Sequence, residues 1–240
     1  MSNIIINQLK ENGVAILKNL YTIPQITNLE NYYKDLNNLD FNNFKKSKYI
    51  YKTHFDKERV YSKNFYINSE IEAIEITKGR YDIYYKNCYM NLHTKVFEIM
   101  NHFMNPENRN HKWGYLTSSM QSDNGHWHRD TVNICGDADE NGMYDDSAMV
   151  HNFNPFYFTV LIPLVPLTLE NGTPEFIKGS HKMTYQEIQE KNNKHLRFET
   201  EIGDAIIFDG RIFHRGCENK SNLDRPVLYN MIQRDWYHEN

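Results

Sequence analysis

The second half of the chain, from Lys112 onward, consists of short segments that favour strands and are separated by turn residues. They cover residues 115–120, 125–131, 156–164, 173–177, 205–208, 212–217 and 227–234, with a further short one at Phe198. Many short segments with regular turn signals predict a β-sandwich or barrel, and two four-stranded sheets in a jelly roll would accommodate them. Asn171-Gly172 predicts a hairpin within this region. The sequence therefore predicts a mainly β core over residues 106–240.

The first half of the chain carries helical patterns. Residues 4–12 predict a short helix that leads into a strand over residues 14–17. Capping-box patterns at Thr22–Gln25 and Ser69–Glu72 each predict the start of a helix, and Gly79 suits the end of the second. Another apolar series at helical spacing contains Leu92, Val96, Met100 and Phe103. We expect residues 1–105 to form a mostly helical cover, and residues 1–240 to form a single domain.

Composition narrows the class of protein. The chain has 240 residues, of which 40% are hydrophobic and 14% aromatic, as in a globular protein. A net charge of −4 without a long basic run argues against nucleic acid as a partner. The sequence has no apolar run of membrane-spanning length and no signal-peptide pattern. We therefore expect a protein that does not bind membranes. The three scattered cysteines suit a reduced compartment, so we expect the protein to be cytoplasmic.

One stretch of the β half carries a metal-binding pattern. Alternate side chains of an extended chain point to the same side, so His128 and Asp130 share one face while Trp127 and Arg129 share the other. With His214, they could form a 2-His-1-carboxylate triad, which leaves positions open on non-haem Fe(II). A His-x-Asp pair alone is also typical of a surface hydrogen-bonded couple. His126 shares the same parity and is expected to support the site, not to bind the metal.

The spacing between His214 and a later arginine strengthens the interpretation of these residues as a metal site. Arg225 lies 11 positions beyond His214, across a polar turn. A guanidinium there could bind a dicarboxylate through two hydrogen bonds, which lysine does less well.

Taken together, these segments resemble the phytanoyl-CoA dioxygenase (PhyH) family of Fe(II)/2-oxoglutarate oxygenases over nearly the whole chain. The matching pieces are Leu9 to Leu17, Trp127 to Asp130, Asn171-Gly172 leading to Gly179-Ser180-His181, Gly203 to Gly210 and His214-Arg215-Gly216. The chain departs from the family pattern at Lys178, where a proline often precedes the Gly-Ser-His turn.

The resemblance implies a double-stranded β-helix (a jelly-roll or cupin-like core) and a reaction. On this reading His128, Asp130 and His214 bind Fe(II), Arg225 pairs with the far carboxylate of 2-oxoglutarate, and Thr159 adds a hydrogen bond to this co-substrate. O₂ would take the remaining position. The implied reaction hydroxylates an unactivated C–H of a small-molecule substrate and releases succinate and CO₂. The carboxylate of Asp130 favours hydroxylation, or another oxidation without halide, over the halogenation of relatives that lack it.

Other residues are candidates for substrate contacts. Arg80 begins an aromatic segment that is either a surface strand or a wall of the active-site mouth, where Arg80 would meet an anionic group of substrate or co-substrate. Trp127 is a second candidate, although its parity favours packing in the sheet. Residues 131–154 are expected to form a lid. Residues 137–142 resemble the start of an EF-hand, but Ala148 replaces the required glutamate, which argues against calcium.

Two other functions remain open at this point. The first is a cupin-type metalloenzyme that does not use 2-oxoglutarate, against which Arg225 argues. The second is a non-catalytic jelly-roll binding protein, which would not need all three candidate metal ligands.

Overall fold

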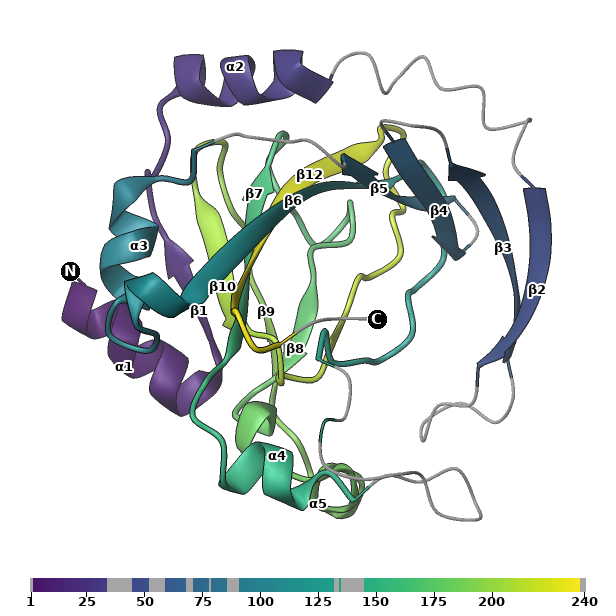
Figure 1. Cartoon of the computed structure of the whole chain (residues 1–240). Coiled ribbons are helices and arrows are strands. Elements are labelled where there is room, and N and C mark those ends of the chain that lie inside the picture. The colour runs from purple at the N-terminus through teal and green to yellow at the C-terminus, as the bar shows by residue number, and fades with distance from the viewer. Residues whose placement is uncertain are drawn as a thin grey trace.

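The computed structural model describes residues 2–33, 45–51, 59–67, 71–77, 79–85, 91–131, 134 and 145–237. Within these residues, the strands form two antiparallel sheets (Figure 1). The nine-stranded sheet has the order β1-β10-β7-β12-β6-β5-β4-β3-β2, and the three-stranded sheet has the order β11-β8-β9. The predicted mainly β architecture is therefore confirmed, but the two sheets are unequal and do not have four strands each.

The strands are β1 (Val14–Leu17), β2 (Lys45–Tyr51), β3 (Arg59–Ile67), β4 (Ile71–Thr77), β5 (Arg80–Tyr85), β6 (Arg109–Ser118), β7 (Tyr157–Pro163), β8 (Glu175–Ile177), β9 (His195–Arg197), β10 (Ala205–Asp209), β11 (His214–Arg215) and β12 (Arg225–Arg234). The helices are α1 (Ser2–Asn12), α2 (Ile23–Tyr33), α3 (Thr94–Met100), α4 (Ser147–His151) and α5 (Tyr185–Glu190), with 3₁₀ turns at η3 (Pro106–Asn108) and η4 (Ser180–Lys182). No helix of the described ranges is long and apolar enough to span a membrane.

The prediction of a helix that starts at Ser69–Glu72 is wrong, because Ile71–Thr77 forms strand β4. β4 pairs with β5 across a turn at Gly79, whose φ is +73°. Isoleucine and threonine restrict χ1 and suit strands, so the composition of this segment outweighs its capping pattern. Strands β2 to β5 extend the larger sheet, and within the described part of residues 1–105 the expected helical cover consists of α1, α2 and α3.

The helices α1, α2 and α3 form where the sequence predicts them. Thr22 donates its backbone N–H to Gln25 Oε1 at 2.8 Å at the start of α2. The apolar faces of α1 and α3 pack with the outer face of the larger sheet, where Phe158 and Val160 are buried in the same cluster. In Figure 1, α1 and α3 lie together on one side of this sheet.

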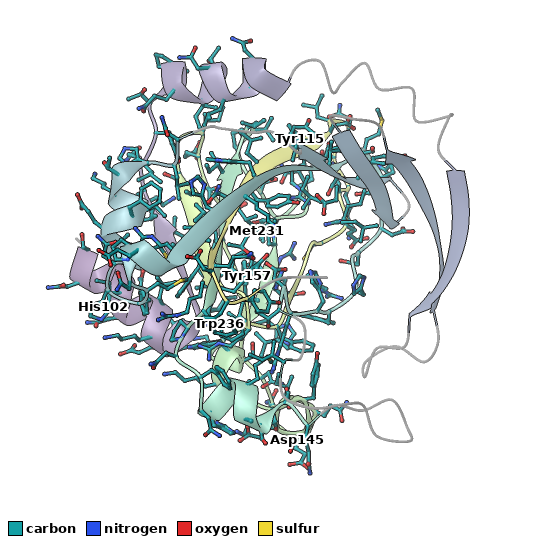
Figure 2. The ribbon with its side chains drawn as sticks, in the orientation of Figure 1. His102, Tyr115, Asp145, Tyr157, Met231 and Trp236 are labelled. Carbon is teal, nitrogen blue, oxygen red and sulfur yellow. The ribbon has the colours of Figure 1, made fainter. Side chains whose placement is uncertain are left out.

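The inner face of the larger sheet packs against the smaller sheet. Leu161 of β7, Phe208 of β10 and Met231 of β12 belong to a second core cluster together with Phe176 of β8. Figure 2 shows Tyr157 and Met231 in the interior of the molecule. Alternate residues of each strand therefore face the interface between the two sheets.

The turn at Asn171-Gly172 does not join a hairpin. Gly172 has a φ of +82°, and Asn171 Oδ1 accepts a hydrogen bond from the Thr168 N–H at 2.9 Å. However, β7 lies in the larger sheet and β8 in the smaller one. The turn prediction is correct, but the turn lies in a crossover between the sheets.

Asp204 ties the start of β10 to the loop after β1. Its side chain accepts hydrogen bonds from Lys18 Nζ at 2.7 Å, the Asn19 N–H at 2.9 Å and the Glu201 N–H at 3.0 Å. Replacement by alanine should lower the free energy of unfolding by about 1–3 kcal/mol, because two backbone donors lose their acceptor. Urea denaturation measures this loss.

The contribution of Asp204 should also depend on pH. Burial alone would raise the pKa of Asp204, but hydrogen bonds from Lys18, Asn19 and Glu201 outweigh it and lower the pKa. The stabilisation is therefore present above the unfolded-state pKa of about 3.9 and is lost as the pH falls through the folded-state pKa. A stability difference between wild type and Asp204→Ala that persists unchanged in acid would contradict this account.

Candidate metal centre

Two extended segments carry the candidate site. His128 and His214 exchange both backbone hydrogen bonds at 3.0 Å, and the Gly125 N–H donates to the Gly216 carbonyl at 2.8 Å. The predicted strand over residues 125–131 is thus an extended segment with a single bridge to β11. This pairing brings two histidines that lie 86 positions apart in the sequence to directly opposed positions.

The side chains of His128, Asp130 and His214 converge. Asp130 Oδ1 lies 3.6 Å from His128 Nε2 and 3.3 Å from His214 Nε2. One potential ligand atom from each of the three residues lies within 4.8 Å of the others. The side chains of His128, Asp130 and His214 are 36%, 20% and 9% exposed, so the cluster opens on the side of His128.

Backbone carbonyls fix the tautomers of both imidazoles. His128 Nδ1 lies 2.9 Å from the His126 carbonyl, and His214 Nδ1 lies 3.1 Å from the Ile212 carbonyl. A carbonyl only accepts hydrogen bonds, so Nδ1 carries a hydrogen, and Nε2 is the nitrogen left to bind a metal when the ring is neutral. This is the arrangement that a metal-binding histidine requires. His126 therefore supports the site through its backbone carbonyl.

The charges of the three groups are coupled. Burial and then the charge of His214 lower the pKa of His128, which favours the neutral imidazole. Burial raises the pKa of Asp130, but the charge and hydrogen bond of His214 outweigh it and lower the pKa overall. Burial likewise opposes protonation of His214, yet the carboxylate of Asp130 raises its pKa. The ionised carboxylate is therefore ready to bind a cation, which would compete with the proton of His214.

Thr159 lies beside the cluster on β7. Its Oγ1 donates a hydrogen bond to Asp130 Oδ2 at 2.6 Å, and the residue is 4% exposed. The family resemblance gives Thr159 a contact with the co-substrate, whereas its observed partner is the candidate ligand Asp130.

Arg80, Ser118 and Arg225 form a row across β5, β6 and β12. Ser118 is the cross-strand partner of both arginines. Arg225 Nη2 donates to Ser118 Oγ at 2.6 Å, and Arg80 Nη2 donates to the Cys217 carbonyl at 2.8 Å. Both arginines are buried, with 1% and 3% exposure for Arg225 and Arg80. Arg80 thus lies in the interior beside Arg225, and not on an exposed rim.

The arginine pair lacks a counter-ion among the described residues. Neither guanidinium contacts a described carboxylate, and neither Nε atom has a hydrogen-bond partner. Burial lowers the pKa of Arg80 to about 10, and burial together with the charge of Arg80 lowers the pKa of Arg225 to about 9. Two adjacent buried cations with free donors are suited to bind an anion.

Glycines hold this arginine pair close to the triad segments. A Cβ atom on Gly216 would overlap Arg80 Nη1, and a Cβ atom on Gly125 would lie 4.0 Å from Arg80 Cζ. Since Gly125 and Gly216 flank His128 and His214, the guanidinium of Arg80 lies against the ends of both segments.

Trp127 and Arg129 point away from the triad, as their parity predicts. The Trp127 ring contacts the guanidinium of Arg215 at 4.7 Å and the ring of His195 at 5.3 Å. Arg129 donates to Asp146 at 2.7 Å. A substrate contact by Trp127 thus has no support in this arrangement.

Half of the expected lid, residues 132–133 and 135–144, lies outside the described residues, and this half includes the calcium-like stretch 137–142. Its described end begins at Asp145, and Asp146 precedes α4. Asp146 and Ser118 belong to no recognisable sequence motif. The strand register reveals the partners of Ser118, and the fold reveals the partner of Asp146.

A cavity of about 540 Å³ lies on the other face of the larger sheet, and its lining includes Lys10, Phe158 and Asp209. Phe158 and Asp209 are cross-strand partners and line this cavity. The neighbouring pair, Thr159 and Phe208, lies on the face of the triad. Because adjacent residues of a strand point to opposite faces, this cavity is separate from the triad.

The fold and the triad together define a jelly-roll protein with a candidate mononuclear metal centre. A family model described as phytanoyl-CoA dioxygenase (PhyH) matches residues 9–227. The chain belongs to the phytanoyl-CoA dioxygenase family.

Curated relatives match over a shorter stretch. The dioxygenase peniF of Penicillium patulum is 33% identical over 73 residues, which is 30% of this chain and 23% of that protein. The dioxygenase af480 of Aspergillus fumigatus is 36% identical over 69 residues, or 28% of this chain and 22% of that protein. The matched stretch thus spans less than a quarter of each relative.

Solved structures resemble the whole fold. AviO1 of Streptomyces viridochromogenes has a TM-score of 0.62 at 14% identity, covering 100% of this chain and 97% of that one. HygX of Streptomyces hygroscopicus was crystallised with nickel, 2-oxoglutarate and hygromycin B. It has a TM-score of 0.62 at 10% identity, covering 100% of this chain and 90% of that one. The epimerase SnoN from nogalamycin biosynthesis has a TM-score of 0.54 at 11% identity, covering 97% and 82%. The predicted jelly-roll class is confirmed.

Proposed function

We propose that this protein is an Fe(II)- and 2-oxoglutarate-dependent oxygenase that hydroxylates a C–H bond of a small molecule and releases succinate and CO₂. The observation that carries the proposal is the convergence of His128, Asp130 and His214, with ligand atoms within 4.8 Å of one another. Family membership and the buried arginine pair support it.

The donor set suits Fe(II). Two imidazole Nε2 atoms and one carboxylate oxygen form the 2-His-1-carboxylate set of non-haem iron oxygenases. When bound, iron with 2-oxoglutarate and O₂ supplies the oxidation chemistry. The contribution of the chain is to present both imidazoles as the required tautomer, to keep Asp130 ionised and to leave one side of the cluster open.

The arginine pair suits the co-substrate. 2-Oxoglutarate is a dianion, and its far carboxylate would find unpartnered donors on both Arg225 and Arg80. Guanidinium groups bind carboxylates through directed pairs of hydrogen bonds. A cupin-type enzyme that does not use 2-oxoglutarate, or a binding protein without a carboxylate ligand, would leave these two buried cations uncompensated.

Structural relatives support the same pair of cofactors and small-molecule substrates. HygX was crystallised with 2-oxoglutarate and hygromycin B, and SnoN with Fe³⁺, α-ketoglutarate and a nogalamycin compound. SnoN is an epimerase, so the fold also accommodates other reactions. Asp130 completes the triad and occupies the position that halogenating relatives leave for a halide, which favours hydroxylation, or another oxidation without halide, over halogenation.

The arginines provide the test. Metal-free protein is supplied with Fe(II), ascorbate and 1-¹⁴C-labelled 2-oxoglutarate in air, and released ¹⁴CO₂ is counted. Arg225→Met and Arg80→Met should each raise the KM for 2-oxoglutarate about 10–100-fold, because each removes charge-assisted hydrogen bonds. Gly216→Ala should do the same by displacing Arg80. The control is Arg215→Met, whose guanidinium pairs with Glu175 outside the site.

No 2-oxoglutarate-dependent ¹⁴CO₂ release by the iron-loaded wild type, alone or with a panel of small molecules, would refute the function. An equal effect of Arg215→Met would show that the arginine variants act through general damage to the fold.

A further inference from the structure

Thr159 occupies a rigid position on the inner face of the larger sheet. It lies in the middle of β7, with Phe208 of β10 and Met231 of β12 as cross-strand partners. The residue is 4% exposed. Its backbone is therefore fixed from both sides, and its hydroxyl has little freedom to exchange partners.

The two oxygens of Asp130 have different surroundings. Oδ2 accepts the Thr159 hydroxyl at 2.6 Å, while Oδ1 lies 3.3 Å from His214 Nε2 and 3.6 Å from His128 Nε2. Oδ1 is therefore the oxygen that faces the candidate metal position, and Oδ2 is held on the side of β7.

The hydroxyl of threonine has one hydrogen to donate. An ionised carboxylate only accepts, so that hydrogen is used in the bond to Asp130. A carboxylate or keto oxygen of 2-oxoglutarate is also an acceptor and would have to compete for the same hydrogen. The contact therefore argues against the co-substrate role that the family resemblance gives to Thr159.

We propose that Thr159 is a positioning residue, which holds Asp130 with one oxygen toward the metal and is not a ligand of 2-oxoglutarate. This inference rests on the proposed function, because it requires that the triad binds a metal. Without the hydroxyl, the carboxylate would be free to rotate, and Oδ1 would no longer be held toward the metal position.

The test separates metal affinity from co-substrate affinity. Thr159→Val keeps the shape of the side chain without the hydroxyl, Thr159→Ala is a second hydroxyl-free variant, and Thr159→Ser keeps the hydroxyl. Mn²⁺ binding to the metal-free proteins is followed by the electron paramagnetic resonance signal of free Mn²⁺. 2-Oxoglutarate binding is then measured by calorimetry at saturating Mn²⁺. Circular dichroism in EDTA shows that each variant is folded.

We expect Thr159→Val and Thr159→Ala to weaken Mn²⁺ binding about 10–100-fold, as loss of a group that orients a metal ligand typically does. Thr159→Ser should bind Mn²⁺ like the wild type, and the Kd for 2-oxoglutarate of the loaded proteins should change little. Unchanged Mn²⁺ affinity with weaker 2-oxoglutarate binding would overturn the inference in favour of a co-substrate role. Absence of Mn²⁺ binding by the wild type would refute the proposed function itself.

Discussion

Replacing Asp130 with alanine should abolish 2-oxoglutarate turnover and weaken Fe(II) binding by more than about 100-fold. The expected loss exceeds the 10–100-fold that is typical when only a group supporting a ligand is removed. Asp130 contributes the sole carboxylate of the described cluster, and its charge also raises the pKa of His214. Equilibrium dialysis under nitrogen measures iron affinity, and counting of ¹⁴CO₂ measures turnover.

Two conditions make this experiment decisive. The buffer must be free of chloride, because a halide can take the position of a missing carboxylate in halogenating relatives. Glu98→Ala serves as the control, since Glu98 is an exposed carboxylate on α3. Iron affinity of Asp130→Ala within a few-fold of the wild type would show that the metal binds elsewhere.

Arg129→Met should destabilise the protein by about 3–5 kcal/mol, which is the typical cost of breaking a buried ion pair from one side. Arg129 Nη1 lies 2.7 Å from Asp146 Oδ2, and the two side chains are 1% and 4% exposed. The guanidinium also packs over the rings of Tyr185 and Phe213 at 4.8 and 5.3 Å. The variant leaves the Asp146 carboxylate buried without its cationic partner, with the Tyr185 N–H as its remaining donor in this region. Urea denaturation gives the change in the free energy of unfolding.

The double variant Arg129→Met/Asp146→Leu tests the cause of this loss. Removing both charges should be less costly than the sum of the two single changes, because neither charge is then left alone. Lys18→Met is the comparison for an exposed partner, since the Lys18 side chain is 56% exposed, and it should cost only about 0–1 kcal/mol. A loss below about 1 kcal/mol for Arg129→Met would contradict the account of a buried pair.

The sequence predicts the parts of the site that depend on local periodicity. Alternation within residues 127–130 correctly separates the side chains of His128 and Asp130 from those of Trp127 and Arg129. Helices α1 and α3 likewise follow from apolar spacing. Such patterns are local because successive residues of a strand or helix have fixed directions.

Other features depend on pairing between distant strands. The sequence names Arg80 and Arg225 separately, but only the register of β5, β6 and β12 places them together through Ser118. β4 is misread as a helix because a local capping pattern cannot report that β3 and β5 flank the segment. Similarly, the bond between Thr159 and Asp130 arises where β7 meets a segment 29 positions away. Register of this kind is set by the whole fold.

The most direct test of the central claim is optical. Metal-free protein is mixed with Fe(II) and then 2-oxoglutarate in the absence of oxygen, and the visible spectrum is recorded for the wild type, Asp130→Ala and Arg225→Met. We expect a charge-transfer band in the wild type that is lost in Asp130→Ala and requires more 2-oxoglutarate in Arg225→Met. A wild type that binds iron but develops no band at any 2-oxoglutarate concentration would contradict the account and favour a metalloenzyme that does not use this co-substrate.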